Sequence, residues 1–530
     1  MDKYFSNILI TSIGYLNTYC MAFIWNSIAV LFLKFGRNYI GDVGHILIMR
    51  RLNLIVVCLD TFRADLIGSS EKLGFVKTPS LDRLAGESVV FRQAYGEGQP
   101  TLQMRRAFFT GCRSFPWRYN FDRRGVWHHA AGWHKIPPNQ PTLAEILLEY
   151  GYYTGLISDT YHMFKPTLNF TRGFVTYEFI RGQESDNWRP GNVKMVWEKI
   201  LKYVRDPENI PPVLVQYLLN TMDRRGEEDF FAPKVFGKAM DWLESSVENQ
   251  PFFLWIDSFD PHEPWDPPRE YADLYYPNYS GIEYILGRPP KNATPEEIER
   301  IKALYFGEVT LVDKWFGLFF EKIVELGLLD NTILMVVSDH GTEIMDHGHF
   351  GKRPQELHPF NTRILWMVRH PDGPRGKEIY EFVQSHDLFP TALNLLDIPC
   401  PQVDGENIWP LVTGEREKIR DYIIIGWAGW RIGPAGGRVS VRTREWNYVT
   451  TIDKPGEEEL YYLPKDREEK NNIVKDYPEI ARKLREKVEA LLGQRLPATL
   501  PELCDRALSP ISQYFEKRRR MEEKILHDVP

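Results

Sequence analysis

Hydrophobic residues occur along this chain in short unbroken runs that end at polar residues. Residues 333–337 form one such run and lead toward Asp339 and His340, and residues 54–59 form another that leads directly into Asp60. Apolar runs of this length predict strands buried on both faces of a parallel sheet. Open α/β sheets place their ligands at the carboxyl ends of their strands. We therefore expect Asp60, Asp339 and His340 to meet at one sheet edge.

Such runs alternate with amphipathic segments along most of the chain. The alternation predicts an α/β catalytic domain over residues 49–410, with a large, mostly parallel sheet flanked by helices on both faces. A charged helical insertion at residues 188–250 is interpreted as a lid or substrate-side element. The predicted strands are residues 53–59, 89–91, 152–158, 252–256 and 331–338, and the predicted helices are residues 79–85, 102–110, 142–150 and 295–328.

The pattern changes beyond residue 410. Short alternating runs predict a small antiparallel sheet within a C-terminal subdomain at residues 411–505. Residues 506–530 are charged and are predicted to form a solvated helical tail. Within the subdomain, the predicted strands are residues 422–427, 438–443, 446–451 and 459–463, and residues 477–492 are the predicted helix.

The first 48 residues differ from the rest of the chain. Residues 8–33 are mostly apolar and long enough to span a bilayer, and basic residues lie mainly on their C-terminal side. One interpretation is a membrane anchor that leaves the catalytic domain in the cytoplasm. The other is that translation starts at Met49 and that the upstream residues are a mis-assigned start. Both interpretations predict a cytoplasmic catalytic domain.

Charge and cysteine usage narrow the classes of partner and compartment. The net charge is -7, and no basic stripe appears, which argues against a nucleic-acid partner. Five scattered cysteines without a Cys-x-x-Cys pair argue against a disulfide framework and fit a reducing compartment. A homo-oligomer is compatible with this composition.

A second candidate feature is the start of the predicted helix at residues 102–110. Gly and Pro residues precede Thr101, which therefore lies near a helix N-terminus, where backbone N–H groups favour an anion. Arg105 lies one helical turn later on the same face. His262 follows the apolar run at residues 252–256 and suits proton transfer near neutral pH.

Together these segments resemble the sulfatase family of the alkaline phosphatase superfamily. The resemblance covers about residues 52–480, and it implies the fold predicted above. Residues 59–65 are similar to the family's first metal-binding strand end, residues 105–111 to the end of its nucleophile motif, residues 338–341, 346–348 and 351–352 to its late metal- and anion-binding segment, and residues 459–463 with 471–473 to its C-terminal signature.

The resemblance also implies roles for individual residues. It implies one divalent metal ion, which could be Mn, Ca, Mg or Zn, and an anion held beside it. The implied metal ligands are Asp60, Thr101, Asp339 and His340, and the implied catalytic residues are Thr101 as nucleophile, Arg105, His262, Lys352 and His162. A second metal site could include Asp260 and His262 with His347, His349 and His358, but the Asp-x-His spacing differs from two-metal phosphatases, so we predict one ion.

Several departures from the sulfatase pattern point toward phosphate chemistry. Family sulfatases carry Cys or Ser where Thr101 stands, and threonine cannot be oxidised to formylglycine because its Cβ carries a methyl group. The family's usual Asn is replaced by His340, and Thr61 follows Asp60 in place of a second aspartate. The Lys-x-His anion clamp appears as residues 160–162, without the lysine.

The predicted function is therefore hydrolysis of a small-molecule phosphate, phosphonate or sulfate ester through a threonine nucleophile and a covalent intermediate. A metal ion suits this reaction because it binds both the nucleophile and a non-bridging oxygen. The alternatives are a true sulfuric ester hydrolase, a membrane-associated phospho-headgroup transferase and a non-catalytic binding protein.

Overall fold

The computed structural model describes residues 51–116, 133, 135–165, 168–353, 356–427, 437–452 and 456–498. The hydrophobic segment predicted at residues 8–33 and the charged tail at residues 506–530 lie outside the described residues. Within the described part of the chain, no helix combines the length and the apolar character needed to cross a bilayer.

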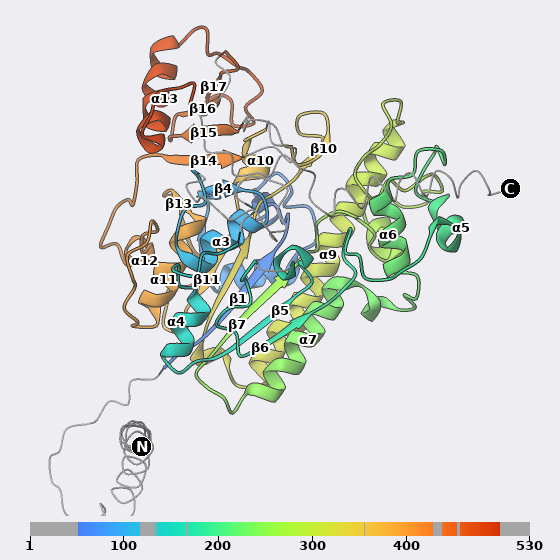
Figure 1. Ribbon diagram of the computed structural model, residues 1–530, viewed down its shortest axis with the longest axis horizontal. Coiled ribbons are helices and arrows are strands. Elements are labelled where there is room, and N and C mark those ends of the chain that lie inside the picture. The colour runs from blue at the N-terminus through green and yellow to red at the C-terminus, as the bar shows by residue number, and fades with distance from the viewer. Residues whose placement is uncertain are drawn as a thin grey trace, which may run out of the picture. The chain divides into compact units, whose positions relative to one another are not determined.

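An eight-stranded sheet forms the centre of the catalytic domain (Figure 1). Its two middle strands, β1 and β8, run parallel in register from Asn53↔Thr332 to Leu59↔Ser338. Only the pairs β11–β8 and β11–β2 are antiparallel. In spatial order the strands are β12 (Lys377–Ile379), β2 (Val89–Phe91), β11 (Trp366–Arg369), β8 (Thr332–Ser338), β1 (Asn53–Leu59), β7 (Phe252–Ser258), β5 (Tyr153–Ser158) and β6 (Thr176–Phe179).

Helices cover both faces of this sheet, because the middle strands are apolar on both sides. Ile55, Val57 and Leu59 of β1 pack into one core, and the intervening Leu54 and Val56 pack into the other. The first core contains α2 (Pro79–Gly86), α6 (Pro212–Asn220), α7 (Phe231–Ser246) and α9 (Pro295–Glu325), and the second contains α3 (Leu102–Thr110), α4 (Leu143–Glu149), α11 (Leu388–Leu395) and α12 (Trp409–Thr413).

Shorter elements connect these layers. The insertion predicted at residues 188–250 contains α5 (Trp197–Ile200), α6, two 3-10 turns (Val193–Val196 and Glu227–Asp229) and α7, which packs on the sheet. The remaining short elements are β3 (Ala94–Tyr95), α8 (Arg269–Asp273), β9 (Glu343–Ile344), β10 (Phe350–Gly351), α10 (Pro359–Thr362) and β13 (Val383–Gln384).

The C-terminal subdomain contains a second sheet, on which α13 (Pro478–Leu492) packs through Leu484 and Val488. Four of its strands form the antiparallel sheet predicted from the sequence. The fifth, β4 (Gly98–Gln99), comes from the loop just before Thr101 and pairs parallel with β14. The order is β17 (Glu459–Tyr462), β16 (Trp446–Thr451), β15 (Arg438–Arg442), β14 (Ile423–Trp427) and β4.

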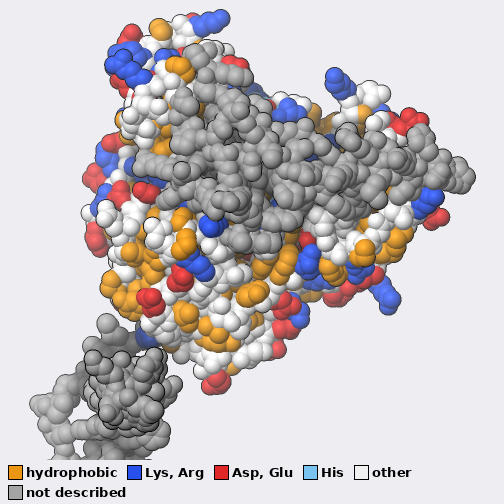
Figure 2. Space-filling model, viewed as in Figure 1, with side chains coloured by type: hydrophobic (Ala, Val, Ile, Leu, Met, Phe, Trp, Pro, Cys, Tyr) orange, Lys and Arg blue, Asp and Glu red, His pale blue; other side chains and the backbone are white. Residues whose placement is uncertain are grey.

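The predicted fold class, a large mostly parallel sheet flanked by helices with a small antiparallel C-terminal sheet, is confirmed. The pairing of β4 with β14 was not predicted, and it ties the C-terminal sheet to the loop that carries Thr101. On the coloured part of the face in Figure 2, basic and acidic side chains are interspersed.

Candidate metal and anion site

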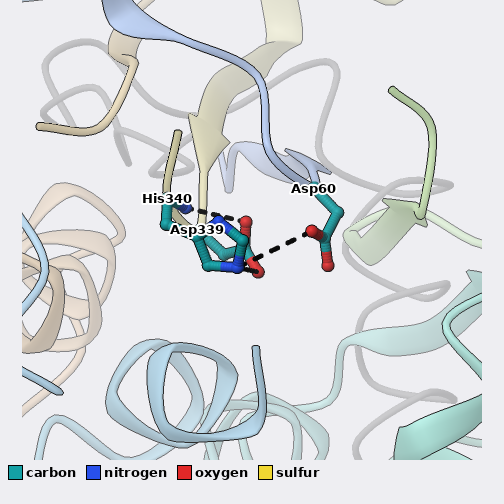
Figure 3. A group of neighbouring side chains, drawn as sticks. All are labelled: Asp60, Asp339 and His340. Carbon is teal, nitrogen blue, oxygen red and sulfur yellow. Dashed lines mark hydrogen bonds and ion pairs between the residues drawn. The ribbon is translucent and has the colours of Figure 1, made fainter. Parts of the chain in front are cut away.

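Three side chains meet at the carboxyl ends of β1 and β8, as the sequence predicts. Asp60 follows β1, and Asp339 and His340 follow β8, and all three are completely buried. Their ligand atoms lie within 4.8 Å of one another (Figure 3). Among the described residues, no other group of three or more metal-binding side chains meets this criterion.

The free atoms of this group suit a divalent metal ion. The Nδ1 atom of His340 lies 2.9 Å from the Gly341 carbonyl oxygen, so Nδ1 carries the proton and Nε2 keeps its lone pair. That Nε2 and Oδ1 of Asp60 are both buried without a hydrogen-bond partner, and they lie 3.8 Å apart. Two facing lone-pair atoms with no donor between them are an arrangement that a bound cation would satisfy.

Burial shapes the protonation of the group. It lowers the pKa of His340 to about 4, so the imidazole is neutral at neutral pH and able to bind a metal. Burial, with the neighbouring Asp339, raises the pKa of Asp60 well above its usual value. For Asp339, burial acts upward, but His340 and Arg105 outweigh it and lower the pKa to about 2. A bound cation would favour ionised Asp60.

Arg105 links the carboxylates of Asp60 and Asp339 to that of Asp257. Its guanidinium donates to Oδ2 of Asp339 at 2.6 Å and to Oδ2 of Asp60 at 3.1 Å. It also forms a bidentate pair with Asp257, at 3.0 Å from Nε and 2.7 Å from Nη2. The side chain is completely buried and is placed there by its position in α3, one turn after Thr101. Arg105 therefore fixes the start of α3 against the metal-binding group.

Asp257 was not predicted as a site residue. It lies near the end of β7, between Arg105 and Thr160, whose hydroxyl donates to Oδ1 of Asp257 at 2.6 Å. The signal was present in the sequence, because Asp257 follows a buried apolar run just as Asp60 does. The run is followed by several acidic residues, however, and the pattern alone does not show which one faces the site.

Thr101 has an unusual backbone conformation. It is the N-cap residue of α3, with φ 45° and ψ -86°, and its side chain makes no capping hydrogen bond. A positive φ in a β-branched residue is a rare and strained conformation that occurs mainly at functional sites. Thr101 is 2% exposed, and its carbonyl oxygen accepts a hydrogen bond of 3.3 Å from Nη1 of Arg105. The backbone of Thr101 is thus in contact with the arginine that links the carboxylates of the metal-binding group.

His262 and Lys352, predicted from distant segments, form a direct pair. Nζ of Lys352 donates to Nε2 of His262 at 2.5 Å, and Nδ1 of His262 lies 2.5 Å from the Glu263 carbonyl oxygen. Burial lowers the pKa of His262 to about 3, and the Lys352 charge acts in the same direction. The same charge also acts to lower the pKa of Asp60 and of His340, so Lys352 is within electrostatic range of the metal-binding group.

A lysine contacts His162, although the Lys-x-His pattern lacks its lysine in the sequence around this histidine. Nζ of Lys165, three residues later, lies 2.9 Å from Nδ1 of His162. Burial lowers the pKa of Lys165 to about 8. His162 and His262 both contact the ring of Phe259, with centroid separations of 6.2 and 4.1 Å. The two histidines therefore flank one aromatic side chain, each with a lysine at its ring nitrogen.

The histidines considered for a second metal lie elsewhere. His347 and His358 stack on each other at 4.1 Å, and they pair with Glu343 and Glu469, respectively. His349 pairs with Glu356. Asp260 accepts hydrogen bonds from Gln183 and from the backbone N–H of Ala232, while His262 faces Lys352. The described residues thus do not assemble the second metal site considered from the sequence.

Two family models match the sequence of this chain. The model described as "Sulfatase" matches residues 52–398, which contain every residue of the site. The model described as "N-sulphoglucosamine sulphohydrolase, C-terminal" matches residues 345–494, which contain four of the five strands of the small C-terminal sheet, all but β4.

Individual proteins of known activity or structure are also similar to this chain over most of its length. An arylsulfatase of Clostridium perfringens is 25% identical over 462 residues, covering 80% of this chain and 90% of the relative. The multifunctional alkaline phosphatase superfamily protein PehA of Trinickia caryophylli is 24% identical over 413 residues, covering 69% and 78%. The solved phosphonate monoester hydrolase of Agrobacterium radiobacter has a TM-score of 0.64 at 20% identity, covering 85% of this chain and 97% of that chain.

Proposed function

The chain belongs to the sulfatase family of ester hydrolases, and from this premise we propose that it cleaves phosphate or phosphonate monoesters with the Thr101 hydroxyl as nucleophile. The observation that carries the proposal is the strained, buried Thr101 at the start of α3. A backbone held at φ 45° costs stability, and such a cost persists where it positions a reacting group. Threonine also excludes formylglycine chemistry at this position.

The cation that this family uses would be held by Asp60, Asp339 and His340. Such a divalent ion supplies Lewis-acid stabilisation of the attacking hydroxyl and of one non-bridging ester oxygen. The two unpartnered buried atoms, Oδ1 of Asp60 and Nε2 of His340, support this assignment. Thr101 would join them as the fourth ligand implied by the resemblance.

The charges around the group favour a tetrahedral anion. The guanidinium of Arg105 bonds a carboxylate of the group, and the ammonium groups of Lys352 and Lys165 each contact one of the two histidines that flank Phe259. In a buried site, such preorganised donors stabilise charge that develops in the transition state. The two ammonium groups would hold the non-bridging oxygens while the Thr101 oxygen attacks phosphorus, and Arg105, whose N–H groups already bond the site carboxylates, would keep those carboxylates in place.

Lys352 is the proposed donor to the leaving oxygen. His262 has a pKa of about 3 and is neutral at neutral pH, so it does not itself supply a proton there. Its Nε2 instead accepts from Nζ of Lys352 and fixes the ammonium. Lys352 can then give a proton to the leaving-group oxygen, which departs as the Thr101–phosphorus bond forms, and the proton of the Thr101 hydroxyl passes to water.

The second half of the reaction regenerates the hydroxyl. Threonine has a single hydroxyl, so the covalent ester can be released only when water attacks the phosphorus and the Thr101 oxygen departs with a proton. Arg105, hydrogen-bonded to Asp60, Asp257 and Asp339, keeps its position through both displacements.

A screen of aryl phosphate, phosphodiester, phosphonate and sulfate esters, with Mn, Mg, Ca or Zn added in turn, tests the proposal. We expect the highest kcat/KM with a phosphate or phosphonate monoester. Thr101→Ala should lower this value by at least about 10³-fold. Thr110→Ala, at the other end of α3, is the matched control and should retain most activity.

Two outcomes would contradict the proposal. Turnover of sulfate esters alone would make the chain a sulfuric ester hydrolase with an unmodified threonine. Undiminished turnover in Thr101→Ala would place the nucleophile elsewhere.

A further inference from the structure

A cavity of about 510 Å³ lies between the C-terminal sheet and the catalytic domain, and it contains none of the residues of the metal and anion site. Four arginines line it: Arg363, Arg442, Arg444 and Arg467. None of its described lining residues is acidic. We call this cavity the arginine pocket. Arg363 belongs to the catalytic domain, and the other three belong to the strands and loops of the C-terminal sheet.

Two of the arginines are held by glutamates that lie outside the pocket lining. Nη1 of Arg442 donates to Glu469 at 2.5 Å, and its guanidinium lies 5.2 Å from the centre of the Tyr95 ring. Nη2 of Arg363 donates to Glu71 at 2.8 Å. Each carboxylate partner lies outside the lining of the pocket. The remaining N–H groups of these arginines are therefore held in place for a further acceptor, which lowers the entropic cost of binding one.

The other two arginines lie at the exposed side. Arg444 is 64% exposed and pairs with Glu381. Arg467 is exposed, and among the described residues it has no ion-pair or hydrogen-bond partner. Four guanidinium groups around one cavity, one of them unpaired, create a positive potential that favours an anion. Arginine is also the side chain best suited to bidentate recognition of sulfate, phosphate or carboxylate groups.

The rest of the lining is mostly apolar and aromatic, with Gln93 and Thr443 as its neutral polar residues. Tyr95 packs against Phe382 at a centroid separation of 6.1 Å, and Tyr380 is 58% exposed beside them. A cavity of this volume fits a small molecule rather than a protein segment. One exposed aromatic ring, that of Tyr380, and two more buried rings in the wall, beside guanidinium groups, suit the flat, weakly polar body of an organic ligand.

From these features we propose that the arginine pocket binds a small organic anion, in which a sulfate, sulfonate, phosphate or carboxylate group is attached to a ring. The anionic group contacts Arg442 and Arg467, and the ring lies against Tyr95 and Tyr380. Because the pocket joins the C-terminal sheet to the catalytic domain, the ligand holds these two parts together. The proposal is independent of the reaction at Thr101.

Isothermal titration calorimetry on the full chain with naphthalene-2-sulfonate tests the proposal. This probe combines an anion with a ring and contains no ester bond to hydrolyse. We expect one binding event that is retained in Lys352→Ala, which lacks a cation of the catalytic site. The double variant Arg444→Ala/Arg467→Ala should weaken binding at least about tenfold, because it removes the charge-assisted contact of Arg467 and the nearby positive charge of Arg444.

One control tests the location of the binding site, and two others test the anionic group and the ring of the ligand separately. Arg416→Ala removes another exposed arginine, which pairs with Glu406 outside the pocket, and it should leave the affinity unchanged. Inorganic sulfate and neutral 2-naphthol should each bind more weakly than the probe. The proposal is overturned if the wild-type chain does not bind the probe, if the double variant binds it as tightly, or if only Lys352→Ala loses binding. Equal affinity for inorganic sulfate would overturn the part that assigns the ring.

Discussion

At the scale of single residues, the backbone of Thr101 offers a test that does not depend on activity. At φ 45° and ψ -86°, any Cβ is strained, whereas glycine adopts this region freely. We therefore expect Thr101→Gly to be more stable than Thr101→Ala by about 1 kcal/mol in urea unfolding. Both variants should lack turnover.

Thr110 is the matched control, because it is the last residue of the same helix. Helix propensity favours alanine over glycine there, so the order of stability should reverse. If Ala is as stable as Gly at position 101, the strain that we assign to Thr101 is absent.

The titration of Lys165 should set the alkaline limb of the pH profile of kcat/KM. Its folded pKa of about 8 lies below its usual value of 10.5 because of burial, so the ammonium is lost as pH rises through 8. We expect kcat/KM for an anionic ester to fall through a pKa near 8. Lys165→Arg should move this limb to higher pH, and Lys165→Met should lower kcat/KM at neutral pH and abolish the limb.

The same shift has the opposite sign for stability. Between pH 8 and 10.5 the unfolded chain binds a proton that folded Lys165 has released, so the free energy of unfolding should rise with pH relative to Lys165→Met. A pH profile identical in wild type and Lys165→Met would show that Lys165 does not act on the bound anion.

At the scale of elements, the end of β8 depends on a close approach at Gly341. A Cβ added there would lie 2.0 Å from the carbonyl oxygen of Phe360 in the segment of α10, so one of the two backbones must move. Because His340 is adjacent, we expect Gly341→Ala to lower both stability, by more than about 1 kcal/mol, and metal affinity. Gly86→Ala, where a Cβ meets no atom within 4 Å, should be neutral. Equal metal content in both variants would contradict this role of Gly341.

The elements also decide which parts of the site could be predicted from the sequence. Asp60 and Asp339 were predictable because buried apolar strands deliver their next residues to one sheet edge. Arg105 was predictable from helical spacing relative to Thr101. The contact of Lys165 with His162 depends on a single 3-10 turn, and the pairing of β4 with β14 joins segments more than 300 residues apart. Neither leaves a periodic signal in the hydrophobic pattern, so neither could be predicted.

At the scale of the whole molecule, metal binding should couple to stability. A cation that binds only the folded chain stabilises it by about 2.7 kcal/mol at a hundredfold excess over Kd. We expect chelator to lower the unfolding temperature and a divalent ion to restore it, with saturation at one ion per chain. His340→Ala should abolish the metal-induced shift, whereas His349→Ala, which lies outside the group, should retain it. A shift that survives His340→Ala would contradict the assigned ligands.

The central claim, that the hydroxyl of Thr101 attacks the ester, is tested most directly by rapid acid quench during turnover, followed by mass spectrometry of the peptide that contains residue 101. If this claim is correct, the resting chain has an unmodified threonine and the quenched sample has a phosphoryl group on Thr101, with no adduct in Thr101→Ala. A quenched wild-type peptide that stays unmodified at Thr101 while another residue carries the group would contradict it.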